Sequence, residues 1–353
     1  MEPIKTTPYP MFGIEGYYHK IPTYESINEN NIESLEQSVI NGLKKIYEIN
    51  EGSGYYFCVL WGVKVDDEII INDNLKIIPF EKLPESKQKD WLKNHTPDLT
   101  SPYGYNITDY IPDSILIYKT KFKPLVYLTQ EDFNVNRSHQ ENIGYFLYTI
   151  SLVLTLIGPR STILGAHWLE FDDKDIQEVS EKYYMKTFLR IFNRVVYQPR
   201  FYPSYPILEI SETINTINNY LNFNIGNKGR LNIALYRFNL AMIKEKIGEK
   251  TVELSIAMEC ILGGEGNTEI SYKLITRFVR FLGGDKEERL NNKKILKKLY
   301  DFRSTLMHTG NEPKNLEINK HTIDSGLIIF SMFLRKIIEL GDIPHWKEFD
   351  ILN

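Results

Sequence analysis

The chain has 353 residues, of which 42% are hydrophobic, 25% charged and 13% aromatic. This composition is typical of a globular protein and excludes an intrinsically disordered one, and the length suffices for two domains. The formal net charge of −4 excludes a uniformly basic protein, so nucleic-acid binding would require a local basic patch.

Neither export nor membrane insertion is indicated. Residues 1–10 contain prolines and lack a basic-then-apolar signal sequence. The longest apolar run, residues 143–158, is shorter than the roughly 20 residues of a membrane span, which favours a buried helix. The two cysteines, Cys58 and Cys260, support neither a disulfide framework nor a cysteine zinc site. The sequence therefore predicts a cytoplasmic protein without a membrane partner.

The first half of the chain has a mixed α and β pattern. Helical spacing of apolar residues predicts helices, whereas β-branched and aromatic runs between turn residues predict strands. The expected helices cover residues 32–49, 137–158 and 180–192. The expected strands cover residues 55–65, 68–71, 75–80, 114–128 and 162–171. The aromatic residues of 55–61 are expected in the core rather than on a binding surface.

A domain boundary is expected near residue 225. Pro199, Pro203 and Pro206 punctuate the chain before it, and residues 218–229 are rich in Asn and Gly, which favours a loop over a helix. The predicted fold class is α+β. It consists of a mixed α/β domain over residues 1–225 and an all-α domain over residues 226–345.

The second domain has the pattern of a helical bundle. Its helices are separated by glycines, and Asp285 is placed to cap the fourth. The expected helices cover residues 231–247, 250–262, 270–282, 290–308 and 318–340.

An arginine and a histidine, Arg303 and His308, lie near the end of the fourth expected helix. With 12 arginines and 7 histidines, an Arg followed by a His after four to six residues arises by chance roughly 0.7 times in this chain. A second pair, Arg160 and His167, follows a helix-breaking Gly-Pro and is expected to be structural. The spacing alone therefore does not identify a catalytic pair. The position of Arg303 and His308 on an amphipathic helix distinguishes them from Arg160 and His167.

Their chemistry suits RNA cleavage. A histidine in the last turn of a helix faces the negative end of the helix dipole, which favours its charged form and allows it to act as acid or base. RNA carries its own nucleophile, the ribose 2′-hydroxyl, so cleavage requires an acid, a base and cations on the phosphate, without a metal or cofactor.

The five-residue spacing separates the two side chains around the helix. Five residues correspond to about 140° of rotation and 7.5 Å of rise, so the two side chains do not lie on the same face of the helix. Two copies of the chain would supply two histidines and two arginines, which predicts a homodimer as the active form.

The surrounding charge favours a phosphate partner. From Tyr272 to Arg303 there are ten Lys or Arg and four acidic residues, 10 − 4 = +6. Within this stretch Lys293, Lys294, Lys297 and Lys298 are candidates for RNA binding, although a lysine run is also typical of a solvated helix face.

Three strings, IAMECIL, ISYKLITRFVRFLGG and LKKLYDFRSTLMHTG, resemble the HEPN superfamily, in particular the Apea-like HEPN domain of bacterial abortive-infection proteins. The resemblance covers residues 230–341. It implies a dimeric bundle that cuts RNA, often tRNA, without metal through an Arg-x4-6-His motif. It also implies a variable N-terminal module that senses infection, such as a phage-derived trigger, or restrains the nuclease.

The resemblance implies that Arg303 and His308 form the catalytic pair. Ser304 occupies the polar position after the arginine, and Glu259 and Arg277 match the acidic and basic helix positions of the branch. Alternatively, Glu259 forms a buried ion pair inside the bundle, for which Arg277 is a candidate partner. Tyr300 is expected in the core or an interface.

A different class of function remains open: a non-catalytic HEPN module that binds RNA or a protein. A nucleotidyltransferase-type partner is set aside because no Gly-Ser pair followed by paired aspartates is evident.

Overall fold

The computed structural model describes residues 52–94, 111–122, 130–158, 160–172, 190–191, 206–263, 270–310 and 316–352, together with the single positions 37, 41, 44 and 48. The expected helix over residues 32–49 therefore lies mostly outside the described residues, as do residues 180–189 and 123–128.

The first half of the structure is an antiparallel sheet with the strand order β2-β3-β4-β1-β5-β6. Its strands are β1 (Gly52–Trp61), β2 (Ile69–Asn72), β3 (Leu75–Pro79), β4 (Ser114–Phe122), β5 (Ile163–Phe171) and β6 (Arg190–Ile191). The expected α+β class is confirmed. A strand is present at each of the five expected places, but the strand expected over residues 55–65 ends at Trp61. The predicted helix over residues 180–192 is wrong at Arg190–Ile191, because these residues pair with Ala166 and His167 of β5.

The central strand β1 is buried on both faces, with a period of two residues. Tyr56, Cys58 and Leu60 belong to the larger core cluster, and Phe57 and Val59 belong to the smaller cluster on the other face. The expectation that the aromatic residues of this strand form core is confirmed.

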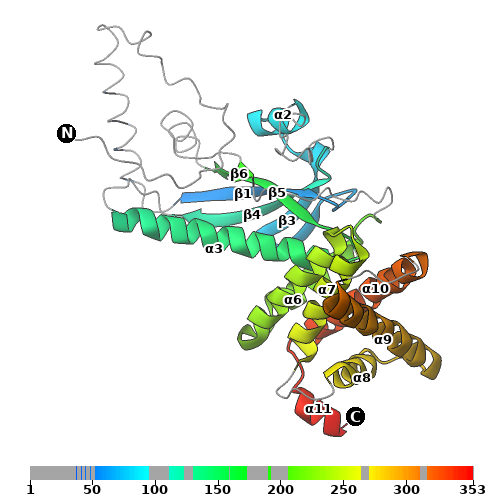
Figure 1. The fold of residues 1–353 in the computed structure, drawn as a ribbon. Helices are drawn as coiled ribbons and strands as arrows, with labels where there is room; N and C mark the ends of the chain where they lie inside the picture. Colours follow the sequence, from blue (N-terminus) through cyan, green and yellow to red (C-terminus); the bar gives the residue numbers. More distant parts are fainter. Residues whose placement is uncertain are drawn as a thin grey trace, which may run out of the picture.

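In the described parts of the first half, helices pack on both faces of the sheet. The helix α3 (Gln130–Leu154) lies along one face of the sheet, as Figure 1 shows, and α2 (Lys87–Asn94) contributes Leu92 to the smaller cluster. Ile150, Val153 and Leu154 at the end of α3 are buried, so the apolar run is a buried helix as expected. Among the described residues, no helix is both long and apolar enough to cross a membrane.

The second half is a bundle of helices at one end of the sheet (Figure 1). Its helices are α5 (Ile210–Leu221), α6 (Ile225–Ile243), α7 (Ile247–Leu262), α8 (Ile270–Leu282), α9 (Lys286–Thr309), α10 (Leu316–Leu340) and α11 (Trp346–Leu352). The stacked rings of Phe278 and Phe333, with centroids 4.4 Å apart, lie in its core together with Phe330.

The expectation of a loop over residues 218–229 is wrong. Residues 218–221 complete α5, and residues 225–229 form the start of α6. The asparagines serve the helix ends instead: the Asn224 side chain accepts a hydrogen bond from the Gly226 N–H and caps α6. Tyr220 and Ile217 bury their side chains, which stabilises α5 despite its Asn content.

Candidate active site

The helix α9 carries the predicted catalytic pair and has well-defined ends. Asp285 and Glu288 form a capping box at its start, which confirms the expected cap. At its end Gly310 adopts φ +68° and its N–H donates to the Leu306 carbonyl at 2.8 Å. His308 consequently lies in the last turn of α9, as expected, and its side chain is exposed.

Arg303 is held by Glu259 of α7. One guanidinium nitrogen, Nη2, lies 3.2 Å from Oε1 and 3.4 Å from Oε2 of the carboxylate. The two side chains are 34% and 31% exposed, so the pair is open to solvent. Nε and Nη1 of Arg303 have no further hydrogen-bond partner among the residues that the structure describes. These nitrogens keep three N–H donors available for a phosphate.

Glu259 and Arg277 do not pair, so the alternative that joined them is wrong. The Arg277 guanidinium binds the Asp350 carboxylate of α11, at 2.7 Å from Nη2 and 3.1 Å from Nε, and donates from Nη1 to the Leu262 carbonyl at 2.7 Å. Arg277 is buried and its charge is compensated. Arg277 is therefore a structural residue of α8 that holds the end of α7.

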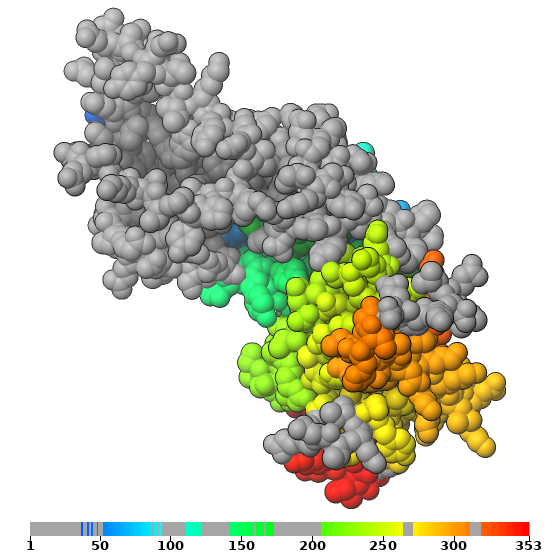
Figure 2. Space-filling model, in the orientation of Figure 1, coloured from blue at the N-terminus to red at the C-terminus, as the bar shows by residue number. Residues whose placement is uncertain are grey.

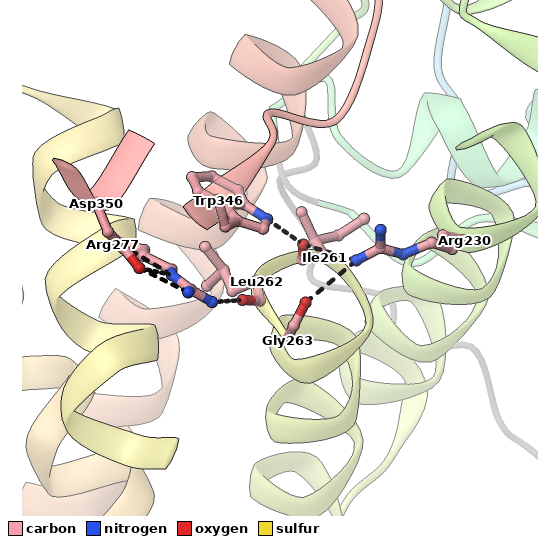
Figure 3. Close-up of polar contacts among 7 residues, drawn as sticks. All are labelled: Arg230, Ile261, Leu262, Gly263, Arg277, Trp346 and Asp350. Atoms are coloured by element: carbon pink, nitrogen blue, oxygen red, sulfur yellow. Dashed lines mark hydrogen bonds and ion pairs between the residues drawn. The ribbon is translucent and has the colours of Figure 1, made fainter. Parts of the chain in front are cut away.

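The last turn of α7, which includes Glu259, is fixed by side chains from three other helices (Figure 3). Arg230 donates to the carbonyls of Cys260, Ile261 and Gly263, and the Trp346 indole N–H donates to the Ile261 carbonyl at 2.7 Å. Carbonyls at a helix C-terminus otherwise lack partners within the helix. The support for Glu259 thus depends on Asp350 and Trp346, which lie beyond the predicted domain limit at residue 345.

Tyr300 lies in the core beside this pair, one turn before Arg303, which confirms the expected burial. Its hydroxyl has no hydrogen-bond partner among the described residues. Burial and, second, the Glu259 carboxylate raise the pKa of the Tyr300 phenol well above its ordinary value, whereas Arg303 lowers it. Tyr300 therefore stays neutral and bounds the Arg303 site on its buried side.

The remaining predicted residues are at the surface. Ser304 is exposed on α9, and so are Lys293, Lys294 and Lys297, while Lys298 is half-buried. None of these four lysines forms an ion pair with a residue in the described parts of the chain. Their charges are available to a partner.

The second Arg-His pair is structural, as expected. Arg160 is fully buried and donates to the carbonyls of Ile157, Gly62 and Pro206, where it joins three segments of the sheet half. His167 lies in β5, opposite Cys58 of β1. Both cysteines, Cys58 and Cys260, are free thiols.

Comparison of the chain with protein-family models, with curated proteins and with solved structures found no match. The HEPN resemblance therefore rests on the sequence strings and the Arg-His helix alone.

Proposed function

We propose that the chain is a metal-independent RNA endonuclease with Arg303 and His308 as catalytic residues. The observation that carries the proposal is the end of α9: an exposed histidine in the last turn, and an arginine that Glu259 holds through one nitrogen while three donors stay available. A guanidinium with available donors is suited to the charge that develops on a phosphate during cleavage.

The reaction follows from the groups present. A histidine accepts the proton of the ribose 2′-hydroxyl, whose oxygen attacks the adjacent phosphorus. The phosphorus–O5′ bond breaks, and a second, protonated histidine donates its proton to the leaving O5′. The products are a 2′,3′-cyclic phosphate and a free 5′-hydroxyl. Because each chain supplies one such histidine, acid and base come from His308 of two copies in a homodimer.

The biological setting of the proposal comes from the HEPN resemblance. We place the enzyme in the bacterial cytoplasm as an anti-phage abortive-infection nuclease that acts on RNA, including tRNA. Its N-terminal domain restrains it until a phage-derived trigger appears. The local basic charge of α9 supports an RNA substrate in a chain whose net charge is −4.

The test is cleavage of RNA by the wild type and by His308→Ala and Arg303→Ala, in expressing cells with a phage challenge and with purified protein. Loss of the acid–base histidine lowers the rate by about 10²–10⁴-fold. His345→Ala, which removes an exposed histidine that lies just before α11 and pairs with Glu348 within α11, is the matched control and retains activity.

Three outcomes contradict the proposal. They are an absence of cleavage under every trigger, full activity of His308→Ala, and loss of wild-type activity on chelation with EDTA. RNA that is bound but never cut would indicate a non-catalytic binding module instead.

A further inference from the structure

Five exposed side chains form one stripe along α9. Their spacings of 7, 4, 7 and 4 residues are close to whole turns, so they stay within about 60° of one another around an ideal helix. The stripe is about 33 Å long. It consists of Lys286, Lys293, Lys297, Ser304 and His308. Three ammonium groups therefore lie along one face of the helix before the catalytic histidine, with the exposed carboxylate of Asp301 at the edge of this face.

The basic end of the stripe borders a shallow hollow between α8 and α9. Lys286, Arg289 and Lys293 supply its charge, and Val279 and Leu290 supply its apolar surface. Leu290 is 58% exposed. A positively charged surface with apolar patches suits a ligand that alternates phosphates with flat rings.

Tyr272 of α8 adds an aromatic platform beside this hollow. Its side chain is 60% exposed, and Nζ of Lys293 lies 5.9 Å from the centre of its ring. A tyrosine flanked by a lysine is the arrangement on which an unpaired base stacks while the cation contacts its phosphate.

We propose that this face of α8 and α9 is a track for single-stranded RNA, a proposal that rests on the proposed nuclease function. Tyr272 stacks on a base, and Lys286, Arg289, Lys293 and Lys297 contact the phosphates between the hollow and His308. Arg303 lies about 100° to the side of the stripe on an ideal helix and receives the phosphate that is cut. Figure 2 shows α9, in orange, at the surface of the helical half.

Single-stranded RNA fits this face better than a duplex. In a duplex the bases are stacked on one another and unavailable to Tyr272, and recognition depends on backbone shape. In a single strand each base presents a face, and stacking on an aromatic residue is largely independent of sequence. Tyr272 should therefore discriminate single strands from duplexes, whereas the lysines contribute to both.

The experiment measures binding, without cleavage, by the full-length His308→Ala protein. A fluorescein-labelled single-stranded RNA is titrated by anisotropy at several salt concentrations, beside a duplex of the same sequence and heparin. On this background, Tyr272→Ala is expected to weaken single-strand binding about tenfold and to leave duplex and heparin binding unchanged. Tyr272→Phe retains the ring and is expected to retain affinity.

The lysines are tested through salt dependence. Each phosphate contact contributes about 0.7 to the slope of log affinity against log salt for a single strand. Lys293→Ala and Lys297→Ala should each lower that slope by about this amount. Lys64→Ala, an exposed lysine of the sheet half, has the same charge change and should leave it unaltered.

The track is overturned if Tyr272→Ala binds the single strand normally, if it weakens duplex or heparin binding equally, or if Lys64→Ala matches Lys293→Ala. These outcomes are distinct from failure of the nuclease. A wild type that binds as expected but never cuts RNA contradicts the catalytic proposal and leaves the track standing.

Discussion

Arg303 is oriented from outside its own helix, by a carboxylate 44 residues earlier in the chain. A single nitrogen contacts both Glu259 oxygens, so the contact fixes the direction of the guanidinium while leaving other donors available. We interpret Glu259 as a positioning residue for Arg303. It acts on the reaction only through the arginine.

The matched pair Glu259→Gln and Glu253→Gln tests this role. Glu253 also belongs to α7 and also forms an ion pair, with Arg237 of α6 at 3.0 Å, in which the glutamate is 15% and the arginine 36% exposed. Misplacement of a catalytic group lowers the rate by up to about 10²-fold, so Glu259→Gln should cleave RNA 10- to 100-fold more slowly. Glu253→Gln should keep full activity.

Thermal unfolding separates positioning from stability. Solvent-exposed ion pairs stabilise a fold by about 0–1 kcal/mol, so both variants should melt within a few degrees of the wild type. Equal rates for the two variants would contradict the positioning role. So would a loss of cleavage by Glu259→Gln that merely parallels a large fall in melting temperature.

At the scale of the element, substitution of two helical glycines by alanine is expected to have opposite effects on stability. A Cβ at Gly326 of α10 would lie 2.5 Å from Cδ1 of Leu299 on α9, whereas a Cβ at Gly229 of α6 would have no neighbour within 4 Å. Gly326 thus sets the close approach of α9 and α10. Gly229 only lowers the helix propensity of α6.

Gly326→Ala should therefore destabilise the protein by about 1–3 kcal/mol through overpacking. Gly229→Ala should stabilise it by roughly 0.5–1 kcal/mol through helix propensity. Equilibrium unfolding in urea measures both. A neutral Gly326→Ala would show that α10 can move away from Leu299 without cost, and the assigned close packing would then be wrong.

The helices bounded by glycines and a capping residue were the most predictable elements. Residues 250–262 and 270–282 lie entirely within α7 and α8, because Gly263 and Gly283 end the helical pattern where the structure ends the helices. The segment 218–229 was not predictable from its Asn and Gly content. Local propensity there is outweighed by burial of Ile217 and Tyr220, which depends on tertiary packing.

Only the part of the site that lies within a single helix was predictable from the sequence. The position of His308 in a last turn follows from the sequence, because Gly310 ends α9. The Glu259–Arg303 and Arg277–Asp350 pairs depend on how α7, α8, α9 and α11 align, which no spacing within one helix encodes. The alternative in which Arg277 is the partner of Glu259 was wrong for this reason.

At the scale of the whole molecule, the sheet half and the bundle share one continuous core. The larger hydrophobic cluster includes Leu60 of β1, Ile150 of α3 and Phe238 of α6. If the proposed restraint of the nuclease is transmitted through this core, the stability of the contact between the two halves bears on the restraint.

Asn239 is a buried polar link between the two halves. Buried on α6, it accepts hydrogen bonds from the Thr155 hydroxyl and the Thr162 N–H, and its amide donates to the Thr162 carbonyl, all within 3.2–3.3 Å. A buried backbone group that loses its partner costs about 1–3 kcal/mol. Removing this one side chain affects both backbone groups of Thr162.

We expect the two halves to unfold together, and Asn239→Ala to shift that shared transition by roughly 2–4 kcal/mol because two backbone groups lose their partners. Tryptophan fluorescence reports mainly on the first half, since three of the four tryptophans precede residue 169, and far-ultraviolet circular dichroism reports mainly on the helices. In urea the two signals should coincide for the wild type and move together in Asn239→Ala.

Asn291→Ala, at an exposed position on α9, should stay within about 0.5 kcal/mol of the wild type. Separate transitions for the two signals would show that the bundle folds independently of the sheet, and a restraint transmitted through this core would then be untenable.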